Sequence, residues 1–246
     1  MRYLIISDIH ANLEAFDSVL AAARASEWER VLVLGDLVGY GADPNAVIDR
    51  VRDLNPTAVI RGNHDKAASG IDDASDFNPA ARAAALWTFE ALTPENRAYL
   101  RDLPAGPAII DDHIEICHGS PLDEDEYMFA GDDAAIGLEA TRTALCFFGH
   151  THIAVVFSAE RTGVAAMVPD DDDAIVEVEG GRRLLINPGS VGQPRDGDPR
   201  AAFAIYDDRE REVGLRRVPY PIERAQEKIL AAGLPRALAS RLAVGR

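Results

Sequence analysis

Cysteine is scarce in this chain, and long hydrophobic runs are absent. The two cysteines, Cys117 and Cys146, each lie inside an apolar stretch, which indicates buried free thiols rather than a disulfide. No run reaches the length of a membrane span, and the N-terminal residues predict a strand instead of a signal peptide. We therefore expect a cytoplasmic protein that does not bind membranes.

Positive charge is scarce as well. The chain has 25 lysines and arginines against 41 acidic residues, which gives a net charge of −16. A surface of this sign does not suit long nucleic acid, whose phosphates are held by Lys and Arg. An acidic protein can still act on a small phosphate ester, nucleotide-derived ones included, if a metal supplies the positive charge. The oligomeric state stays open.

Strand and helix patterns alternate in the first part of the chain. Strand-like runs at residues 2–7, 30–34 and 57–60 alternate with helical patterns at 12–25 and 44–54, the second with Asp43 at its cap position. This order predicts βαβ units and a largely parallel sheet. Residues 66–103 predict a helical insertion near the functional site, with two helices separated at Thr93-Pro94.

Strands dominate the second part. A strand pair at 107–117, a helix near 132–142 and a strand at 144–148 precede a β-rich extension over 153–183, in which Gly180-Gly181 indicates a hairpin turn. Further strands are expected at 183–187, 201–207 and 212–218, and helices at 221–232 and 234–244. Asp170–Asp173 indicates a solvated loop. No repeat or linker divides the chain, so we expect a single domain over residues 1–246.

Polar motifs follow five of the apolar runs directly. The first is Asp8-Ile9-His10, where an extended backbone would place both side chains on one side. The others are Gly35-Asp36, Gly62-Asn63-His64-Asp65, His118-Gly119 and Gly149-His150-Thr151-His152. Neighbouring strands end near one another, so these loops can converge. Oxygen and imidazole ligands without sulfur suit Mn, Fe or Zn, and seven candidates suit two ions about 3.5–4 Å apart better than one tetrahedral site.

As an ordered set, these motifs (D-x-H, G-D-x-x-G, G-N-H-D, H-G and G-H-T-H) resemble the calcineurin-like metallophosphoesterase superfamily. The later segment Asn187–Arg195 is similar to one found in small prokaryotic phosphodiesterase-like members. The resemblance implies an α/β fold, a four-layer αββα sandwich of two mixed β-sheets flanked by helices. It also implies two divalent metal ions and hydrolysis of phosphate esters by a metal-bridged hydroxide.

The resemblance assigns a role to each motif residue. Asp8, His10 and His152 would bind one metal, Asn63, His118 and His150 would bind the second, and Asp36 would bridge both. His64 would be the catalytic residue, facing the phosphate as general acid or as transition-state stabiliser. Asn63 and Arg195 are candidates for substrate binding, although Arg195 could equally form a rim salt bridge with Asp196 or Asp198. Tyr127 and Phe129 could stack on a substrate base or simply pack.

One departure narrows the substrate. Ser/Thr protein phosphatases of this superfamily carry G-D-x-V-D-R-G, whose Arg holds the phosphate, whereas this chain has Gly39 and Tyr40 in place of the Asp and Arg. The loss of that clamp favours a phosphodiester, or an activated small phosphate ester, over a dianionic monoester. Dinucleoside polyphosphates and cyclic nucleotides stay among the candidate substrates. Two alternatives remain: a protein-phosphatase-type phosphomonoesterase, and a metal-binding interaction scaffold without turnover.

Overall fold

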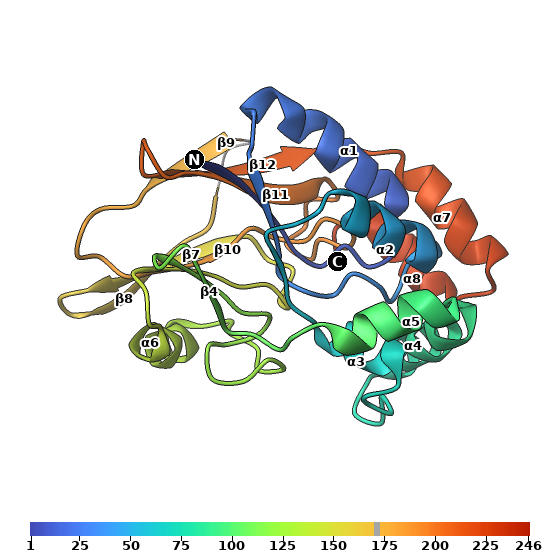
Figure 1. Ribbon diagram of the computed structural model, residues 1–246. Helices are drawn as coiled ribbons and strands as arrows, with labels where there is room; N and C mark the ends of the chain where they lie inside the picture. The colour runs from blue at the N-terminus through green and yellow to red at the C-terminus, as the bar shows by residue number, and fades with distance from the viewer. Residues whose placement is uncertain (170–172) are drawn as a thin grey trace.

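Two six-stranded mixed sheets lie face to face, with helices on both outer sides (Figure 1). The computed structural model describes residues 1–169 and 173–246. Sheet A has the order β3-β2-β1-β11-β12-β9, and sheet B the order β4-β5-β6-β10-β7-β8. The strands of sheet A are β1 (Arg2–Ile6), β2 (Arg30–Val33), β3 (Ala58–Val59), β9 (Asp173–Glu177), β11 (Ala201–Asp207) and β12 (Glu212–Val218). Those of sheet B are β4 (Ala108–Ile110), β5 (Ile114–Ile116), β6 (Leu145–Phe147), β7 (Val155–Glu160), β8 (Gly163–Met167) and β10 (Leu184–Asn187).

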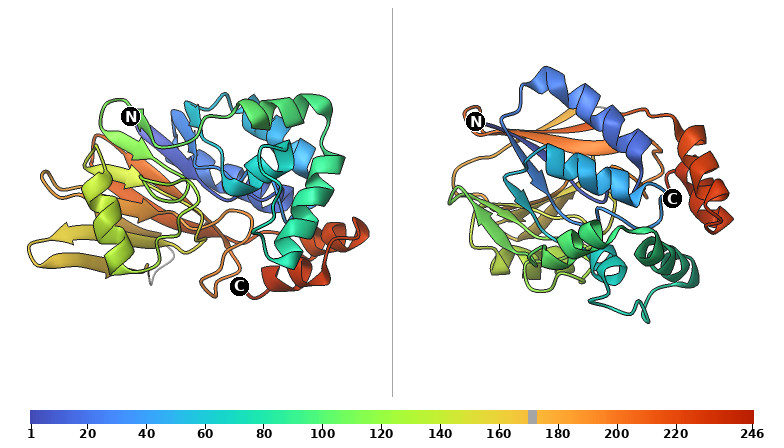
Figure 2. Two further views of the ribbon diagram at one scale, coloured as in Figure 1. Left: turned by 90° about the horizontal axis from the view of Figure 1, so that it is seen from below. Right: turned by 45° about the vertical axis from the view of Figure 1, so that its right-hand side comes forward.

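The helices form the two outer layers. On the side of sheet A lie α1 (Leu13–Ala23), the 3-10 turn η1 (Arg24–Ser26), α2 (Pro44–Asp53), α7 (Ile222–Ala231) and α8 (Arg236–Leu242). Beside α2 lie α4 (Pro79–Ala91) and α5 (Pro94–Asp102), which pack with the short α3 (Asn63–Ser69). Helix α6 (Gly131–Ala140) covers sheet B at β7, β8 and β10, as both views in Figure 2 show. None of the described helices is long and apolar enough to cross a membrane.

Alternation along the buried strands creates the layers. In β1, Leu4 and Ile6 face the helices of sheet A, while Tyr3 and Ile5 face sheet B. In β6, Phe147 faces the space between the sheets, and its neighbours Cys146 and Phe148 pack towards α6. Three apolar cores therefore separate four layers, and the predicted αββα sandwich is confirmed.

Six strands lead into the functional site. Strands β1, β2 and β3 are parallel neighbours in sheet A, and β5, β6 and β10 are parallel neighbours in sheet B. Parallel neighbours end at the same edge of a sheet, where α/β proteins hold their ligands. Every motif singled out in the sequence follows one of these six strands, in a loop or, for Gly62-Asn63-His64-Asp65, at the start of α3.

Three local predictions were wrong. The turn at Gly180-Gly181 joins no hairpin, because β9 pairs with β12 in sheet A while β10 pairs with β6 and β7 in sheet B. Residues 66–103 contain most of a third helix, α3, in addition to the two expected around Thr93-Pro94. Asp43 precedes α2 without capping it, since its carboxylate instead accepts a hydrogen bond from Lys228. Residues 170–172 of the acidic stretch Asp170–Asp173 lie outside the described residues.

Candidate metal centre

The backbone at the metal motifs is left-handed, where an extended chain was expected. Asp8 and His10 have φ angles of 53° and 49°, and Asp36, His150 and His152 have φ angles of 50°, 66° and 60°. Residues with a Cβ rarely adopt this conformation, and such outliers cluster at functional sites. Asp8 and His10 still converge, with Asp8 Oδ1 at 4.0 Å from His10 Nε2.

The first ligand cluster contains Asp8, His10, Asp36 and His152, all buried, with one candidate ligand atom of each lying within 4.8 Å of the others. His10 Nδ1 lies 3.0 Å from the Val38 carbonyl oxygen, and His152 Nδ1 lies 2.7 Å from that of Gln193. A carbonyl only accepts, so both Nδ1 atoms carry the proton in the neutral ring. The two unprotonated Nε2 atoms then face each other at 3.0 Å. Two lone pairs at this distance repel each other, and a bound cation would relieve that repulsion.

The second cluster contains Asp36, His118 and His150. His118 Nδ1 donates to the Leu34 carbonyl at 2.8 Å, which leaves Nε2 free at 3.3 Å from Asn63 Oδ1. His150 uses its other nitrogen: Nε2 lies 3.1 Å from the Asp125 carbonyl, so Nδ1 is the atom left to bind a metal. Asn63 thus lies beside this cluster, as the sequence predicted.

Asp36 lies between the two clusters. Its Oδ2 is 3.5 Å from His10 Nε2 and 3.5 Å from His118 Nε2, yet this fully buried oxygen accepts no hydrogen bond within the described residues. The other oxygen, Oδ1, accepts the backbone N–H of His64 at 2.8 Å. An orphaned buried carboxylate oxygen between two imidazole nitrogens fits a divalent cation on either side.

Burial and neighbouring charge shift the pKa values of the ligands in different directions. Burial raises the pKa of Asp8 to about 6, with the nearby Asp36 adding to the effect. Burial alone would lower the pKa of His118, but the carboxylates of Asp36 and Asp8 raise it to about 10. Burial lowers the pKa of His150 to about 3 and holds that of His152 well below its usual value. Most of the rings are therefore neutral and ready to bind a metal.

His64 lies beside the clusters but in neither. Its ring is 3% exposed and lies against Tyr40 and Phe77, with ring centroids at 4.3 and 4.7 Å. Its Nδ1 has no hydrogen-bond partner among the described residues, and burial lowers the pKa of the ring to about 4. Gly39 packs directly against the ring: a Cβ there would lie 2.5 Å from Nδ1. Aromatic contacts, and no described carboxylate, hold the ring of this histidine in place.

Arg195 lies at the edge of the first cluster. Its guanidinium donates to Tyr40 Oη at 3.2 Å and to Gln193 Oε1 at 3.0 Å. The alternative of a rim salt bridge is not observed within the described residues, because Asp196 pairs with Arg217 and Asp198 with Arg200. Arg195 keeps its positive charge facing the centre.

Tyr127 and Phe129 form a short aromatic stack on the second cluster. The Tyr127 ring lies 3.8 Å from that of His150, nearly parallel, and Phe129 stacks on Tyr127 at 5.1 Å. The packing interpretation therefore holds for Tyr127, which contacts both His150 and Phe129, although both side chains remain exposed.

Sequence reasoning missed the residues that support these ligands. Ser190 Oγ donates to the Asp8 carbonyl at 2.8 Å, and Asn187 Nδ2 donates to the Gly149 carbonyl at 2.8 Å. These two residues and Gln193 lie in the segment Asn187–Arg195, whose resemblance to known phosphodiesterase-like proteins was the available signal. Phe77, which packs on His64 from the loop before α4, had no signal in the sequence.

Comparisons with known proteins agree with this arrangement. The model of the calcineurin-like phosphoesterase superfamily domain matches residues 1–211. An uncharacterised protein of Methanocaldococcus jannaschii is 37% identical over 251 residues, covering 98% of this chain and 97% of the relative. The crystal structure of a metallophosphoesterase from Sphaerobacter thermophilus is 42% identical, covers 100% of both chains and has a TM-score of 0.90. A hypothetical protein from Pyrococcus horikoshii is 22% identical over 100% of this chain and 98% of its own, with a TM-score of 0.80. The chain therefore belongs to the calcineurin-like phosphoesterase superfamily.

Proposed function

We propose that this protein is a metal-dependent hydrolase of phosphate esters, and of phosphodiesters in particular. The observation that carries the proposal is Asp36 Oδ2, a buried carboxylate oxygen without a hydrogen bond among the described residues, at 3.5 Å from the Nε2 atoms of His10 and His118. One divalent ion would be held by Asp8, His10 and His152. A second would be held by Asn63, His118 and His150, and Asp36 would contact both ions. When bound, such ions supply a water of lowered pKa and withdraw charge from phosphoryl oxygens.

The remaining residues orient and stabilise the substrate. Arg195 contributes a positive charge to a phosphate oxygen, and its hydrogen bonds to Tyr40 and Gln193 fix its direction. His64 is buried against Tyr40 and Phe77 without a described carboxylate partner, so its ring is neutral in the free protein. A neutral ring stabilises the leaving oxygen by donating a hydrogen bond. Of the two roles considered for His64, transition-state stabilisation is therefore favoured over proton donation.

The charge available for phosphate favours a diester. A monoester carries two negative charges at neutral pH, and the Arg that holds it in protein phosphatases is replaced here by Tyr40. The Tyr40 hydroxyl accepts a hydrogen bond from Arg195 and faces no second arginine among the described contacts. A diester carries a single negative charge, which suits one guanidinium.

A panel of two esters, with and without metal, tests the proposal. The purified protein is given a bis-aryl phosphate and an aryl monophosphate, each with Mn²⁺ and with a chelator. We expect metal-dependent cleavage of both, with the diester faster. A faster monoester would indicate a phosphomonoesterase, and no cleavage of either would indicate a binding scaffold; both results contradict the proposal.

A further inference from the structure

A cleft of about 430 Å³ opens beside the second ligand cluster. Asn63, His64 and His150 line its inner end, and the loop before α4 together with the stretch around Tyr127 lines its outer part. Its volume lies within the range of small-molecule sites, roughly 300–1,000 Å³. Because His64 faces it, this cleft is where the alcohol portion of a bound ester would lie.

The walls of the cleft are aromatic. Phe77 lines one side against His64, and Tyr127 lines the other against His150. Tyr127 is 44% exposed, so part of its ring stays accessible although His150 and Phe129 both stack on it. Aromatic faces attract cations as well as planar groups.

The rim of the cleft is acidic. Asp72 and Asp76 are exposed and line it, and Asp72 is held in place by a 2.7 Å hydrogen bond from the Ala74 N–H to its Oδ1. The loop that carries them is anchored on α3, since the backbone N–H groups of Ile71 and Asp72 donate to the Lys66 carbonyl. The Asp72 carboxylate thus has a defined position at the entrance, and the exposed Asp76 lines the same rim.

The lysine that lines the cleft is already ion-paired. Lys66 is the one lysine or arginine among the described lining residues. Its Nζ contacts Asp125 Oδ2 and lies 3.2 Å from Glu124 Oε1. A second phosphate or a carboxylate on the alcohol side would therefore meet uncompensated negative charge.

From this charge pattern, and resting on the proposed function, we propose that the cleft selects esters whose alcohol portion carries no negative charge and favours a positively charged, ring-bearing one. Polyphosphate chains are excluded, because their further phosphates would lie between Asp72, Asp76 and the Lys66 ion pairs. The phosphate itself remains with the ligand clusters and Arg195.

The test uses two aryl methyl phosphodiesters, whose phenol bears either a para-trimethylammonium or a para-carboxylate group. The ratio of their kcat/KM values is compared between the natural protein and an Asp72→Asn/Asp76→Asn variant, so that the different reactivity of the two phenols cancels. We expect the variant to shift this ratio by about tenfold towards the carboxylate ester, the effect of two exposed charges. An Asp53→Asn/Glu139→Gln variant removes two exposed acids that do not line the cleft and should leave the ratio unchanged.

Binding separates this inference from the proposed function. Benzylphosphonates with the same two para groups contain a P–C bond that cannot be hydrolysed, and calorimetry gives their Kd for the manganese-loaded protein. The same tenfold shift in the Kd ratio is expected in the Asp72→Asn/Asp76→Asn variant. Ratios that do not change, in rate or in Kd, would overturn the inference even if esters are cleaved. A shifted Kd ratio without cleavage of any ester would support the cleft and overturn the proposed hydrolysis.

Discussion

His10 Nε2 and His152 Nε2 lie 3.0 Å apart, although each ring already donates its other nitrogen to a backbone carbonyl. The two carbonyls fix the tautomers, so neither Nε2 can take the proton without losing a hydrogen bond. The chain therefore holds two lone pairs in mutual repulsion before any ligand arrives. The arrangement is that of a preorganised cation site.

Metal binding should release a proton. Without metal, the pKa of His118 near 10 means that this ring is protonated at pH 7, and it must lose that proton to become a ligand. Calorimetric titration of the chelator-treated protein with Mn²⁺ in two buffers of different ionisation enthalpy should show release of about one proton at pH 7. The observed Kd should rise about tenfold for each unit that the pH falls. Enthalpies that do not depend on the buffer would contradict a protonated His118.

Asp36→Asn should empty the centre. Asparagine tolerates the left-handed backbone at this position, where φ is 50°, but it removes the negative charge shared by both clusters. We expect metal affinity to fall by roughly 100-fold or more, measured by elemental analysis after dialysis. Asp17→Asn, which removes a surface acid paired with Arg50, is the control and should keep the metal content. Unchanged stoichiometry in Asp36→Asn would exclude Asp36 as the shared ligand.

His64→Ala should keep the metal and lose rate. The ring belongs to neither ligand cluster, so elemental analysis should find the natural metal content. Loss of one preorganised donor to the leaving oxygen should lower kcat by about 10²–10³-fold. A neutral donor does not titrate in the working range, so His64 should cause no fall in kcat at alkaline pH. The pH profiles of the natural protein and of the variant should therefore have the same shape on the alkaline side. Such a fall would restore His64 as a general acid.

Gly39→Ala tests the packing under His64. Gly39 has a φ of +91°, and an added Cβ would lie 2.5 Å from His64 Nδ1, so both the backbone and the ring must move. We expect a loss of about 1–3 kcal/mol in the free energy of unfolding, measured in urea, together with a lower kcat. Gly131→Ala at the start of α6 is the matched control, since no atom lies within 4 Å of its added Cβ. Equal stability of the two variants would show that Gly39 is not constrained.

The two lysines allow a paired test. Lys66 forms ion pairs with Glu124 and Asp125. The backbone carbonyl of Asp125 in turn accepts a hydrogen bond from His150 Nε2 at 3.1 Å. Lys66→Met should therefore destabilise the protein by about 1–2 kcal/mol and also lower kcat about tenfold or more, because the stretch that orients His150 loses its anchor.

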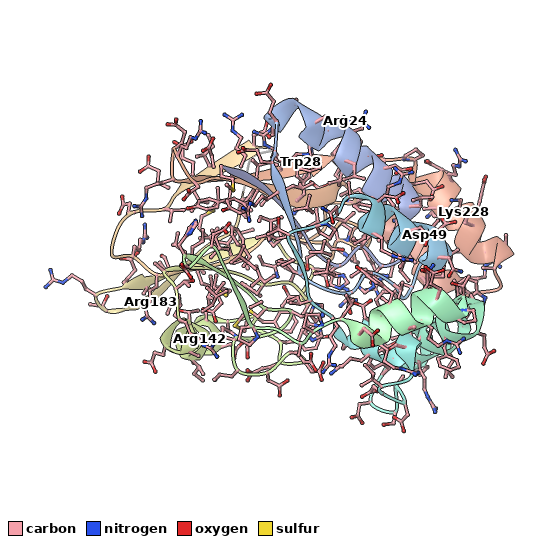
Figure 3. The ribbon with its side chains drawn as sticks, viewed as in Figure 1. Arg24, Trp28, Asp49, Arg142, Arg183 and Lys228 are labelled. Atoms are coloured by element: carbon pink, nitrogen blue, oxygen red, sulfur yellow. The ribbon has the colours of Figure 1, made fainter. Side chains whose placement is uncertain are left out.

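Lys228→Met is the control for this pair. Lys228 lies on α7 on the helical side of sheet A and pairs with Glu14 at 2.6 Å and Asp43 at 2.7 Å (Figure 3). A similar loss of stability with unchanged kcat is expected. If Lys66→Met lowered the stability but left kcat unchanged, the link from Lys66 to His150 would have no effect on catalysis.

The four layers were expected from the family resemblance, whereas the convergence of the polar motifs follows from local rules. Alternation in Tyr3–Ile6 defines a strand buried on both faces, and a polar motif after each such strand lies at the edge of its sheet. Asp36, His118 and His152 could thus be brought together without any knowledge of the loops between them.

The remaining features depend on contacts between distant parts of the chain. A Gly-Gly sequence is the same whether the turn joins two strands of one sheet or connects two different sheets. The strand partners of Leu184–Asn187 could therefore not be predicted from the turn. Phe77 packs on His64 from a loop whose course is set by anchoring on α3. No local sequence pattern predicts the contact between Phe77 and His64, and the shape of the cleft depends on that contact.

The ligands are divided between the two halves of the sandwich. Asp8 and Asp36 follow strands of sheet A, whereas His118 and His152 follow strands of sheet B. Neither sheet alone carries all four of these candidate ligands, so the site is complete only where the two sheets meet. Docking of the sheets and completion of the binding site are one and the same event.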